Sequence, residues 1–130
     1  MATLTPTLTL NSADATSDQL AFSVTDTLSF KAPFQQISQV IIGTSATTIV
    51  AATTDVIYLY VRHTGTTDGT TSTSETVDIK TTVSTPVAFA RLAAGEWCFL
   101  PYNFEAESNG VQINSSSANI QVEYAFFTKM

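Results

Sequence analysis

The sequence predicts an all-β protein. Thr and Ser make up more than a quarter of the 130 residues, and the β-branched Thr side chain favours the pleated strand over the helix. Strong helix formers such as Glu, Lys and Met are scarce. Short apolar runs also alternate with polar residues at a period of two, which is the pattern of half-buried strands. Nine or ten strands and no helix are expected.

The length of 130 residues suits one domain, because a domain of this size buries roughly two thirds of its unfolded surface without needing disulfides. We find no internal repeat and no linker. The economical prediction is a single antiparallel β-sandwich, jelly-roll-like in its connections. Residues 1–18 are expected to form an extended N-terminal arm or edge strand with a turn, and residues 19–130 the sandwich.

The first ten residues alternate apolar and Thr side chains, which places Leu4, Leu8 and Leu10 on one side. Pro6 interrupts this apolar set and lacks an N–H donor, so the segment is expected at a sheet edge or as a free arm. An arm of this kind could reach a neighbouring subunit. The three leucines are therefore candidate interface residues.

The next apolar run, residues 20–30, has Leu20, Phe22 and Val24 on one face before the alternation resumes at Leu28 and Phe30. Two short strands or one bulged strand would produce this pattern. Residues 36–43 and 47–52 are two β-branched runs separated by a Gly-Thr-Ser turn, which suggests a hairpin.

Residues 55–63 form the clearest strand, and their apolar residues on both sides predict burial between two layers. His63 ends this strand and is expected to enter solvent. Residues 64–75 contain no apolar side chain and are expected to form a solvated, mobile loop. Ala93, Ala94 and Gly95 form a predicted turn. Asn109-Gly110 is the strongest hairpin signal in the chain, because both residue types tolerate positive φ.

The charge pattern excludes several functions. The net charge is −6, and the five Lys and Arg residues are spread singly along the chain. No basic cluster exists to neutralise phosphates, so direct nucleic-acid binding and docking on an anionic membrane are not expected. The N-terminus lacks a basic and then apolar leader, no run of about 18 apolar residues occurs, and Cys98 is the only cysteine. Synthesis in a cytoplasm is expected.

No enzyme is predicted, because the chain offers no catalytic constellation. His63 is the only histidine, and Cys98 has no visible base or helix N-terminus to activate it. Acid pairs such as Asp14 with Asp18 lack the spacing of a calcium loop, and solvated turns explain them. No phosphate-binding or metalloprotease motif occurs. No cofactor and no metal are expected.

The stretch LAAGEWCFLPYNF contains the only Trp and the only Cys. Trp97 and Phe99 are two residues apart, so they share one face of a strand, while Cys98 and Leu100 share the other. The pair could belong to the core, to a subunit interface, or to a platform on which a sugar ring stacks beside Tyr102, with Asn103 and Glu105 as its polar company. Trp97, Phe99 and Tyr102 are candidate interface residues.

Several phrases of the sequence carry a resemblance to a known class: MATLTPTLTLNSADATSD, FSVTDTLSF, IYLYVRHTG, LAAGEWCFLPYN and ANIQVEYAFFTKM. Together they cover most of the chain. They resemble a recurring class of small tailed-phage virion proteins, found among phages of aquatic bacteria including cyanophages. The phrases are structural and contain no catalytic motif. The Thr/Ser loop at residues 64–75 is longer than is usual for the class.

The resemblance implies a particle component, and the physical features favour a capsid decoration, or cement, protein. Such proteins are small, all-β and commonly trimeric, and they clamp neighbouring major capsid proteins on the outside of the head. The major capsid protein and further copies of the chain are then the expected partners, with the virion as the location. The alternative is a tail-fibre, receptor-binding or baseplate module that contacts host surface polysaccharide.

Overall fold

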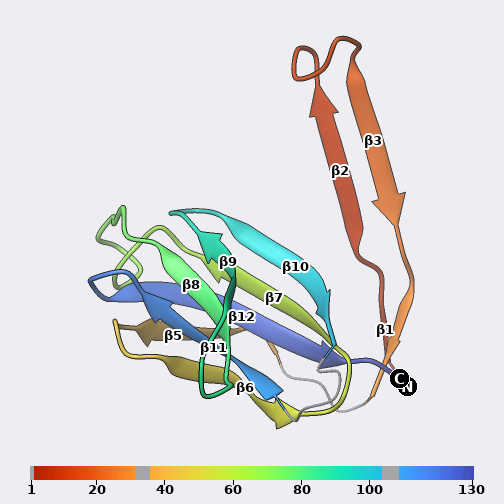
Figure 1. The fold of residues 1–130 in the computed structure, drawn as a ribbon. Helices are drawn as coiled ribbons and strands as arrows, with labels where there is room; N and C mark the ends of the chain where they lie inside the picture. Colours follow the sequence, from red (N-terminus) through yellow and green to blue (C-terminus); the bar gives the residue numbers. More distant parts are fainter. Residues whose placement is uncertain (1, 32–35, 104–108) are drawn as a thin grey trace.

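The computed structural model describes residues 2–31, 36–103 and 109–130 and confirms the all-β prediction. The described residues form twelve strands (Figure 1): β1 Ala2–Leu4, β2 Thr7–Ser12, β3 Leu20–Thr25, β4 Leu28–Phe30, β5 Ser38–Ile42, β6 Thr47–Thr53, β7 Ile57–His63, β8 Val77–Thr81, β9 Ala88–Leu92, β10 Trp97–Tyr102, β11 Asn109–Ser115 and β12 Ile120–Thr128. The count exceeds the prediction because residues 2–30 form four short strands rather than two or three.

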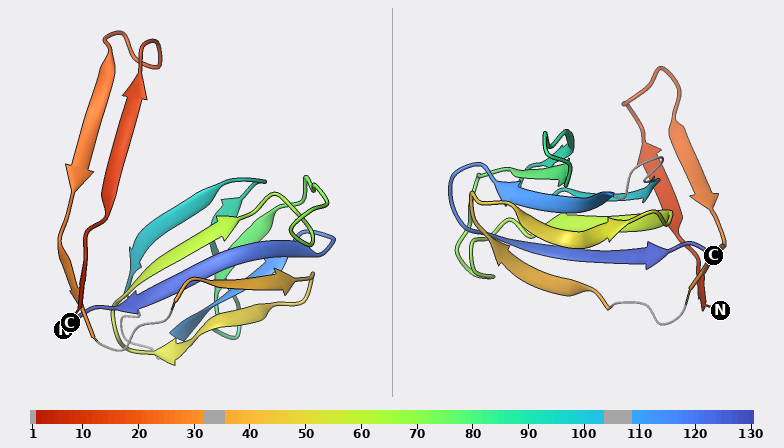
Figure 2. Two further views of the ribbon diagram at one scale, coloured as in Figure 1. Left: turned by 180° about the vertical axis from the view of Figure 1, so that it is seen from behind. Right: turned by 60° about the horizontal axis from the view of Figure 1, so that its bottom comes forward.

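Two four-stranded antiparallel sheets pack face to face as a sandwich (Figure 2). One sheet has the order β10-β7-β12-β5 and the other β6-β11-β8-β9. Since β5 pairs with β12 and β6 pairs with β11, the predicted hairpin over residues 36–52 is wrong: its two strands lie in different sheets. The strand order is compatible with two interleaved Greek keys, which is the connection pattern of a jelly roll.

The core between the sheets is built from alternate residues of the central strands. Ile57, Leu59 and Val61 of β7 face inward and are almost completely inaccessible to solvent. The same alternation fills the core from the other central strands with Val77, Ile79, Val111, Ile113, Ile120 and Val122. This closed aliphatic core explains why the sandwich needs no disulfide.

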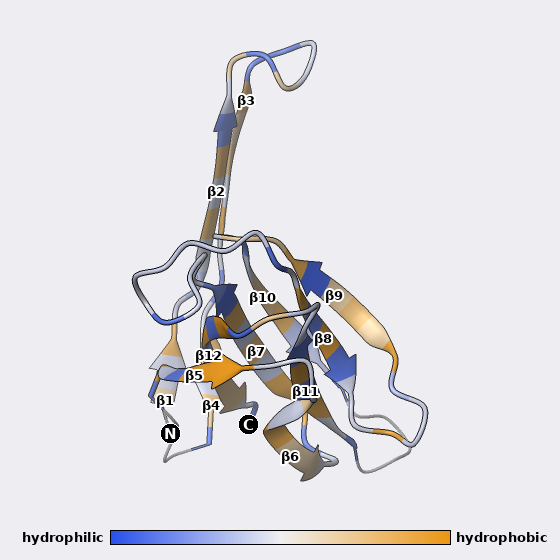
Figure 3. Ribbon diagram, turned by 90° about the vertical axis from the view of Figure 1, so that its left-hand side faces the viewer, coloured by the Kyte–Doolittle hydropathy of each residue, from blue (hydrophilic) through white to orange (hydrophobic). Residues whose placement is uncertain are grey.

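Residues 2–30 lie outside the sandwich. The short strands β1 and β4 pair with each other at its edge, while β2 and β3 pair as a hairpin that projects away from both sheets (Figure 1). In Figure 3 hydrophobic segments recur along both hairpin strands, which stand clear of the rest of the molecule. The expected division at residue 18 falls in the turn of this hairpin, so β3 belongs to the projection together with β2.

Asn109-Gly110 does not form the predicted hairpin turn. Both residues lie at the start of β11, beside β6, where the register of the pairing shifts. Gly110 has no positive φ; a Cβ atom at this position would lie 2.2 Å from the carbonyl oxygen of Val50. The glycine is therefore required by the close approach of two backbones. The predicted turn at residues 93–95 does form, with Gly95 at a φ of 83°.

Candidate interaction surface

The hairpin of β2 and β3 has two chemically different faces. Leu8 pairs with Val24 and Leu10 with Phe22, and directly opposed residues point to the same side of a two-stranded sheet. With Leu20, these residues form what we call the apolar hairpin face. The relative exposure of its four outermost side chains lies between 41% and 49%. A large part of this apolar surface is left in water.

The opposite face of the hairpin carries hydroxyl groups. The hydroxyl oxygens of Thr7 and Thr25 are hydrogen-bonded at 2.9 Å, and those of Thr9 and Ser23 at 3.3 Å. These bonds tie the two strands together on the polar side. A two-stranded hairpin alone is at best marginally stable in water, so the hairpin gains stability when its apolar face is covered.

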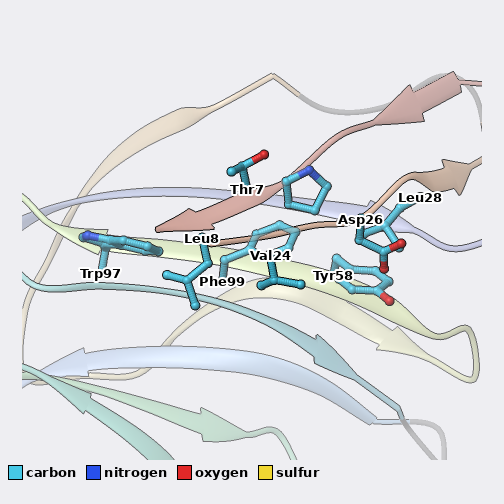
Figure 4. Close-up of a pocket in the computed structure, with 9 residues that line it drawn as sticks. Thr7, Leu8, Val24, Asp26, Leu28, Tyr58, Trp97 and Phe99 are labelled. Atoms are coloured by element: carbon cyan, nitrogen blue, oxygen red, sulfur yellow. The ribbon is translucent and has the colours of Figure 1, made fainter. Parts of the chain in front are cut away.

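A cavity of about 370 Å³ separates the base of the hairpin from the sandwich (Figure 4). On the hairpin side Leu8 and Val24 face into it; on the sandwich side Trp97 and Phe99 of β10 do so. The complete lining is Pro6, Thr7, Leu8, Val24, Asp26, Leu28, Tyr58, Trp97 and Phe99. We call this space the wedge. Its walls are mostly apolar, which suits a protein segment better than a polar solute.

An aromatic cluster fixes the base of the hairpin to the sandwich. Phe30 of β4 is 1% exposed. Its ring lies edge-on to the ring of Tyr58, with 5.7 Å between the ring centroids, and the centroid of the Phe127 ring is 5.3 Å away. Tyr58 in turn stacks on Phe99 at 5.7 Å. The backbone N–H of Lys31 also donates to the carbonyl of Thr128 at 2.9 Å. The hairpin therefore projects from a firmly anchored base.

A smaller apolar cavity of about 220 Å³ lies on the same outer side of the sheet. It shares Pro6 and Phe99 with the wedge and is completed by Leu4, Ile37, Tyr60, Ala125 and Phe127. The outward face of β10, β7 and β12 is thus apolar around Tyr58, Phe99 and Phe127, and it becomes charged further along, where Arg62 and Glu123 lie.

Five of the six predicted interface residues lie along the apolar hairpin face or the two cavities beside it. Leu8 and Leu10 lie on the apolar hairpin face, and Trp97 and Phe99 face the wedge, with Trp97 56% exposed. Leu4 pairs with Leu28 in the anchored segment and lines the smaller cavity. Because Trp97 is this exposed, it is not part of the core of the single chain.

Tyr102 does not join this surface. It points to the opposite side of β10, where its ring stacks on Phe89 at 4.9 Å and packs against the core. Burial raises the pKa of its phenol. Sequence reasoning also missed Phe22, Val24 and Tyr58 as parts of the surface. The sequence did show that Leu20, Phe22 and Val24 share one face of a strand. It did not show that this strand pairs with residues 7–12, which is what brings the two apolar rows together.

His63 corrects the expectation of a solvent-exposed strand end, since it is completely buried. Its Nδ1 accepts a hydrogen bond from the Gly65 N–H at 2.9 Å, so the proton sits on Nε2, which donates to the Glu75 carbonyl at 2.8 Å. The imidazole therefore joins both ends of the loop at residues 64–75. It serves as a structural anchor.

The loop itself is more organised than expected. The Thr67 N–H donates to the Thr71 carbonyl at 2.8 Å, and the Thr73 N–H donates to the Gly65 carbonyl at 3.0 Å. The Gln121 N–H donates to the carbonyl of Thr66 at 2.9 Å, which ties the loop to β12. The loop is exposed at its tip, as predicted, but its backbone is extensively hydrogen-bonded.

We expect acid to release the tip of this loop only at very low pH. Asp68 accepts hydrogen bonds from the backbone N–H groups of Thr71 and Thr70 at 2.8 and 2.9 Å, and these bonds lower the pKa of its carboxyl from 3.8 to about 2. Because the folded pKa is depressed, the stabilising effect is present above pH 3.8 and is lost as the pH falls through about 2.

Carboxyl carbon NMR of Asp68, followed with the amide shifts of Thr70 and Thr71, measures this transition. All three signals should titrate together near pH 2. In Asp68→Ala the two amides should show no such step, and a wild-type midpoint near 3.8 would contradict the loop geometry.

Groups suited to catalysis or metal binding do not converge in the described part of the chain. Cys98 faces the core side of β10, and burial raises the pKa of its thiol, which disfavours the reactive thiolate. Residues 2–31, 36–103 and 109–130 contain no group of three His, Cys, Asp or Glu side chains that could hold a metal ion. Two polar residues were expected beside Trp97 in a sugar-binding platform. Asn103 is exposed, and Glu105 lies outside the described residues.

Comparisons with protein-family models, curated proteins and solved structures found no match to this chain. Among the described residues, none forms a helix long and apolar enough to cross a membrane.

Proposed function

We propose that the protein is a structural component of a tailed-phage particle, specifically a capsid decoration protein that binds the lattice of the major capsid protein on the exterior of the head. The observation that carries the proposal is the apolar hairpin face, which projects from a closed sandwich and is about half exposed. Contiguous exposed apolar surface on a small protein marks an interaction site. The resemblance to phage virion proteins supports a particle as the place where it is used.

The proposed mechanism is mechanical. The aromatic anchor around Phe30 holds the base of the hairpin against the sandwich, so force on the hairpin is transmitted to the body. Burying the exposed half of a large apolar side chain contributes on the order of 1 kcal/mol. Four such side chains per copy, repeated over many copies on a head, would resist separation of neighbouring capsid subunits.

The charge distribution supports an apolar contact. Residues 2–30 contain no Lys or Arg, and the hairpin strands carry no charged residue at all. Binding through this face should therefore depend little on ionic strength, since no counterions are released or ion pairs screened.

Substitution of the apolar hairpin face is expected to abolish capsid binding. In Leu10→Thr with Phe22→Thr, both positions receive the β-branched Thr, which suits a strand, but the apolar contact is lost. We expect occupancy on capsids lacking the native protein to fall at least tenfold, as measured by co-sedimentation. Thr9→Ala with Ser23→Ala, on the hydroxyl face, is the matched control. Undiminished occupancy of the Leu10/Phe22 variant would refute the proposal.

The alternative is a receptor-binding, tail-fibre or baseplate module that contacts host polysaccharide. The exposed indole of Trp97 at the mouth of the wedge favours it. Sugar recognition also needs several converging polar groups, and the wedge is lined by Asp26 and Tyr58, whereas the hydroxyl of Thr7 bonds to Thr25 on the opposite face of the hairpin. Glycan binding that is lost in a folded Trp97→Ala variant would support this alternative, as would a low copy number per particle.

A further inference from the structure

The sandwich has four edge strands, and three of them carry a feature that disfavours pairing with another chain. An open edge presents unpaired N–H and C=O groups, which proline, charged side chains and register shifts protect. Strand β10 contains Pro101, β9 contains Arg91, and the pairing of β6 with β11 shifts register. Strand β5 has neither proline nor charge, and its pairing with β12 is unbroken. In the described part of the chain no strand covers the other side of β5.

We propose that the free edge of β5 pairs with the β5 edge of a second copy of this chain, antiparallel about a two-fold axis, so that two sheets become one continuous sheet. Two identical antiparallel strands meet the condition of a two-fold contact, which uses one patch twice. The opposite edge of this sheet is β10, whose Trp97 and Phe99 face the hairpin (Figure 1). The apolar hairpin face therefore stays free, and the inference goes beyond the proposed function without depending on it.

The exposed side chains of the β5 edge select the register of the pairing. Ile37 and Ile41 are 62% and 54% exposed, and both lie on the outward face with Gln39 between them. With Gln39 on the two-fold axis, Ile37 of each copy lies directly opposite Ile41 of the other, on the same side of the sheet. A shift of one residue would set outward side chains against inward ones, and a shift of two would separate the isoleucines. This register shields both isoleucines of each copy.

The charge distribution favours a second copy at this edge. Each chain has a net charge of −6, so two copies repel unless they meet at an uncharged surface. Residues 32–54 are the longest stretch of the sequence without a charged residue, and both β5 and β6 lie within it. Since residues 43–46 connect these strands directly, both sheets present an uncharged edge on the same side. A stable interface takes about 800 Å² from each partner, to which both layers can contribute.

Sedimentation of the purified full-length chain tests the dimer. At about 50 µM, well above a micromolar Kd, the wild type should have twice the 13.9 kDa mass of the chain. Ile41→Lys places a charge on the edge and should have the mass of one chain. Val87→Lys, which adds the same charge at a similarly exposed residue beside β9, should remain dimeric. A monomeric wild type would overturn the inference, and so would an Ile41→Lys variant as dimeric as Val87→Lys.

Cysteine cross-linking tests the register in a Cys98→Ser background. Directly opposite Cα atoms of an antiparallel pair lie about 4.5–5.5 Å apart, within the range of a disulfide. Gln39→Cys chains should therefore be linked when oxygen, with copper–phenanthroline as catalyst, oxidises their two thiols to one disulfide and is itself reduced. A mixture of Ile37→Cys and Ile41→Cys chains should be linked as well, whereas Ile41→Cys alone should not. Linkage of Ile41→Cys alone, without linkage of Gln39→Cys, would overturn the proposed pairing.

The two proposals fail separately because they use different surfaces. A monomeric wild type that still occupies capsids through its hairpin overturns the dimer alone. A dimer whose Leu10/Phe22 variant occupies capsids undiminished overturns the capsid contact alone.

Discussion

Phe30→Ala should detach residues 2–31 from the sandwich and weaken their attachment to it by up to about 3–5 kcal/mol, the usual cost of deleting a buried phenyl ring. Phe30 is 1% exposed and contacts both Tyr58 and Phe127, so its removal opens the aromatic cluster at its centre. The sandwich core contains none of these contacts and should remain folded. The loss is therefore expected to be mostly local.

Hydrogen exchange measures this local loss. The amides of Lys31 and Met130 donate to Thr128 and Ser29 across the junction, so both should exchange faster in Phe30→Ala by two or more orders of magnitude. Amides of the central strands should keep their protection. Urea denaturation gives the global free energy of unfolding.

Phe22→Ala is the matched control, since the same ring is deleted from a side chain that is 46% exposed. It should cost much less than Phe30→Ala. Equal losses of stability in the two variants, or unchanged exchange of the Lys31 amide in Phe30→Ala, would mean that Phe30 is not the anchor of the hairpin.

The fold class could be predicted from the sequence because it depends on local patterns. Alternation over residues 120–126 repeats along a whole strand, and it placed Val122 on the apolar face without knowledge of its partners. Over residues 56–62 it separated Leu59 from Tyr58, but both sides are apolar, and the predicted burial of both is wrong because the Tyr58 side faces outward and is only partly buried. The same alternation identified Leu8, Leu10, Phe22 and Val24 as two apolar rows. It cannot say that these rows pair with each other, or that they leave the sandwich, because pairing depends on contacts between distant segments.

The same limit explains the error at residues 36–52. A short turn between two β-branched runs predicts a hairpin only if both runs join one sheet, and here β5 and β6 are shared between two sheets. The burial of His63 was missed for another reason. A histidine beside Arg62 at a strand end has no local feature that reveals hydrogen bonds to Gly65 and Glu75.

Asn109-Gly110 was recognised as special for the wrong physical reason. The dipeptide favours positive φ, but Gly110 is needed here because a side chain would occupy the position of the Val50 carbonyl oxygen. The backbone N–H of Gly110 also donates to the hydroxyl of Thr82 at 2.9 Å. The glycine therefore stands where β6, the start of β11 and the end of β8 approach one another.

Gly110→Ala should lower the free energy of unfolding by about 3 kcal/mol, the upper end of the range for overpacking a tight core. The added Cβ would lie 2.2 Å from the Val50 oxygen and 3.0 Å from the Ala51 carbonyl carbon. These are backbone atoms, so relief requires β6 to shift away from β11, which would disturb the core positions of Val50 and Val111. We expect a melting temperature lower by about 10 °C.

Gly43→Ala provides the control, because the nearest atom to its added Cβ is the Asn119 side-chain oxygen at an ordinary 3.4 Å, and Gly43 has no positive φ. Replacing glycine by alanine lowers the entropy of the unfolded chain, which favours alanine at both positions. The difference between the melting temperatures of the two variants, measured by calorimetry, therefore reports the steric effect of the Cβ atom at position 110. Gly43→Ala should be neutral or slightly stabilising. If Gly110→Ala melts at the same temperature as Gly43→Ala, β6 can retreat at no cost, and the tight packing of β6 on β11 is not what holds that edge of the sandwich.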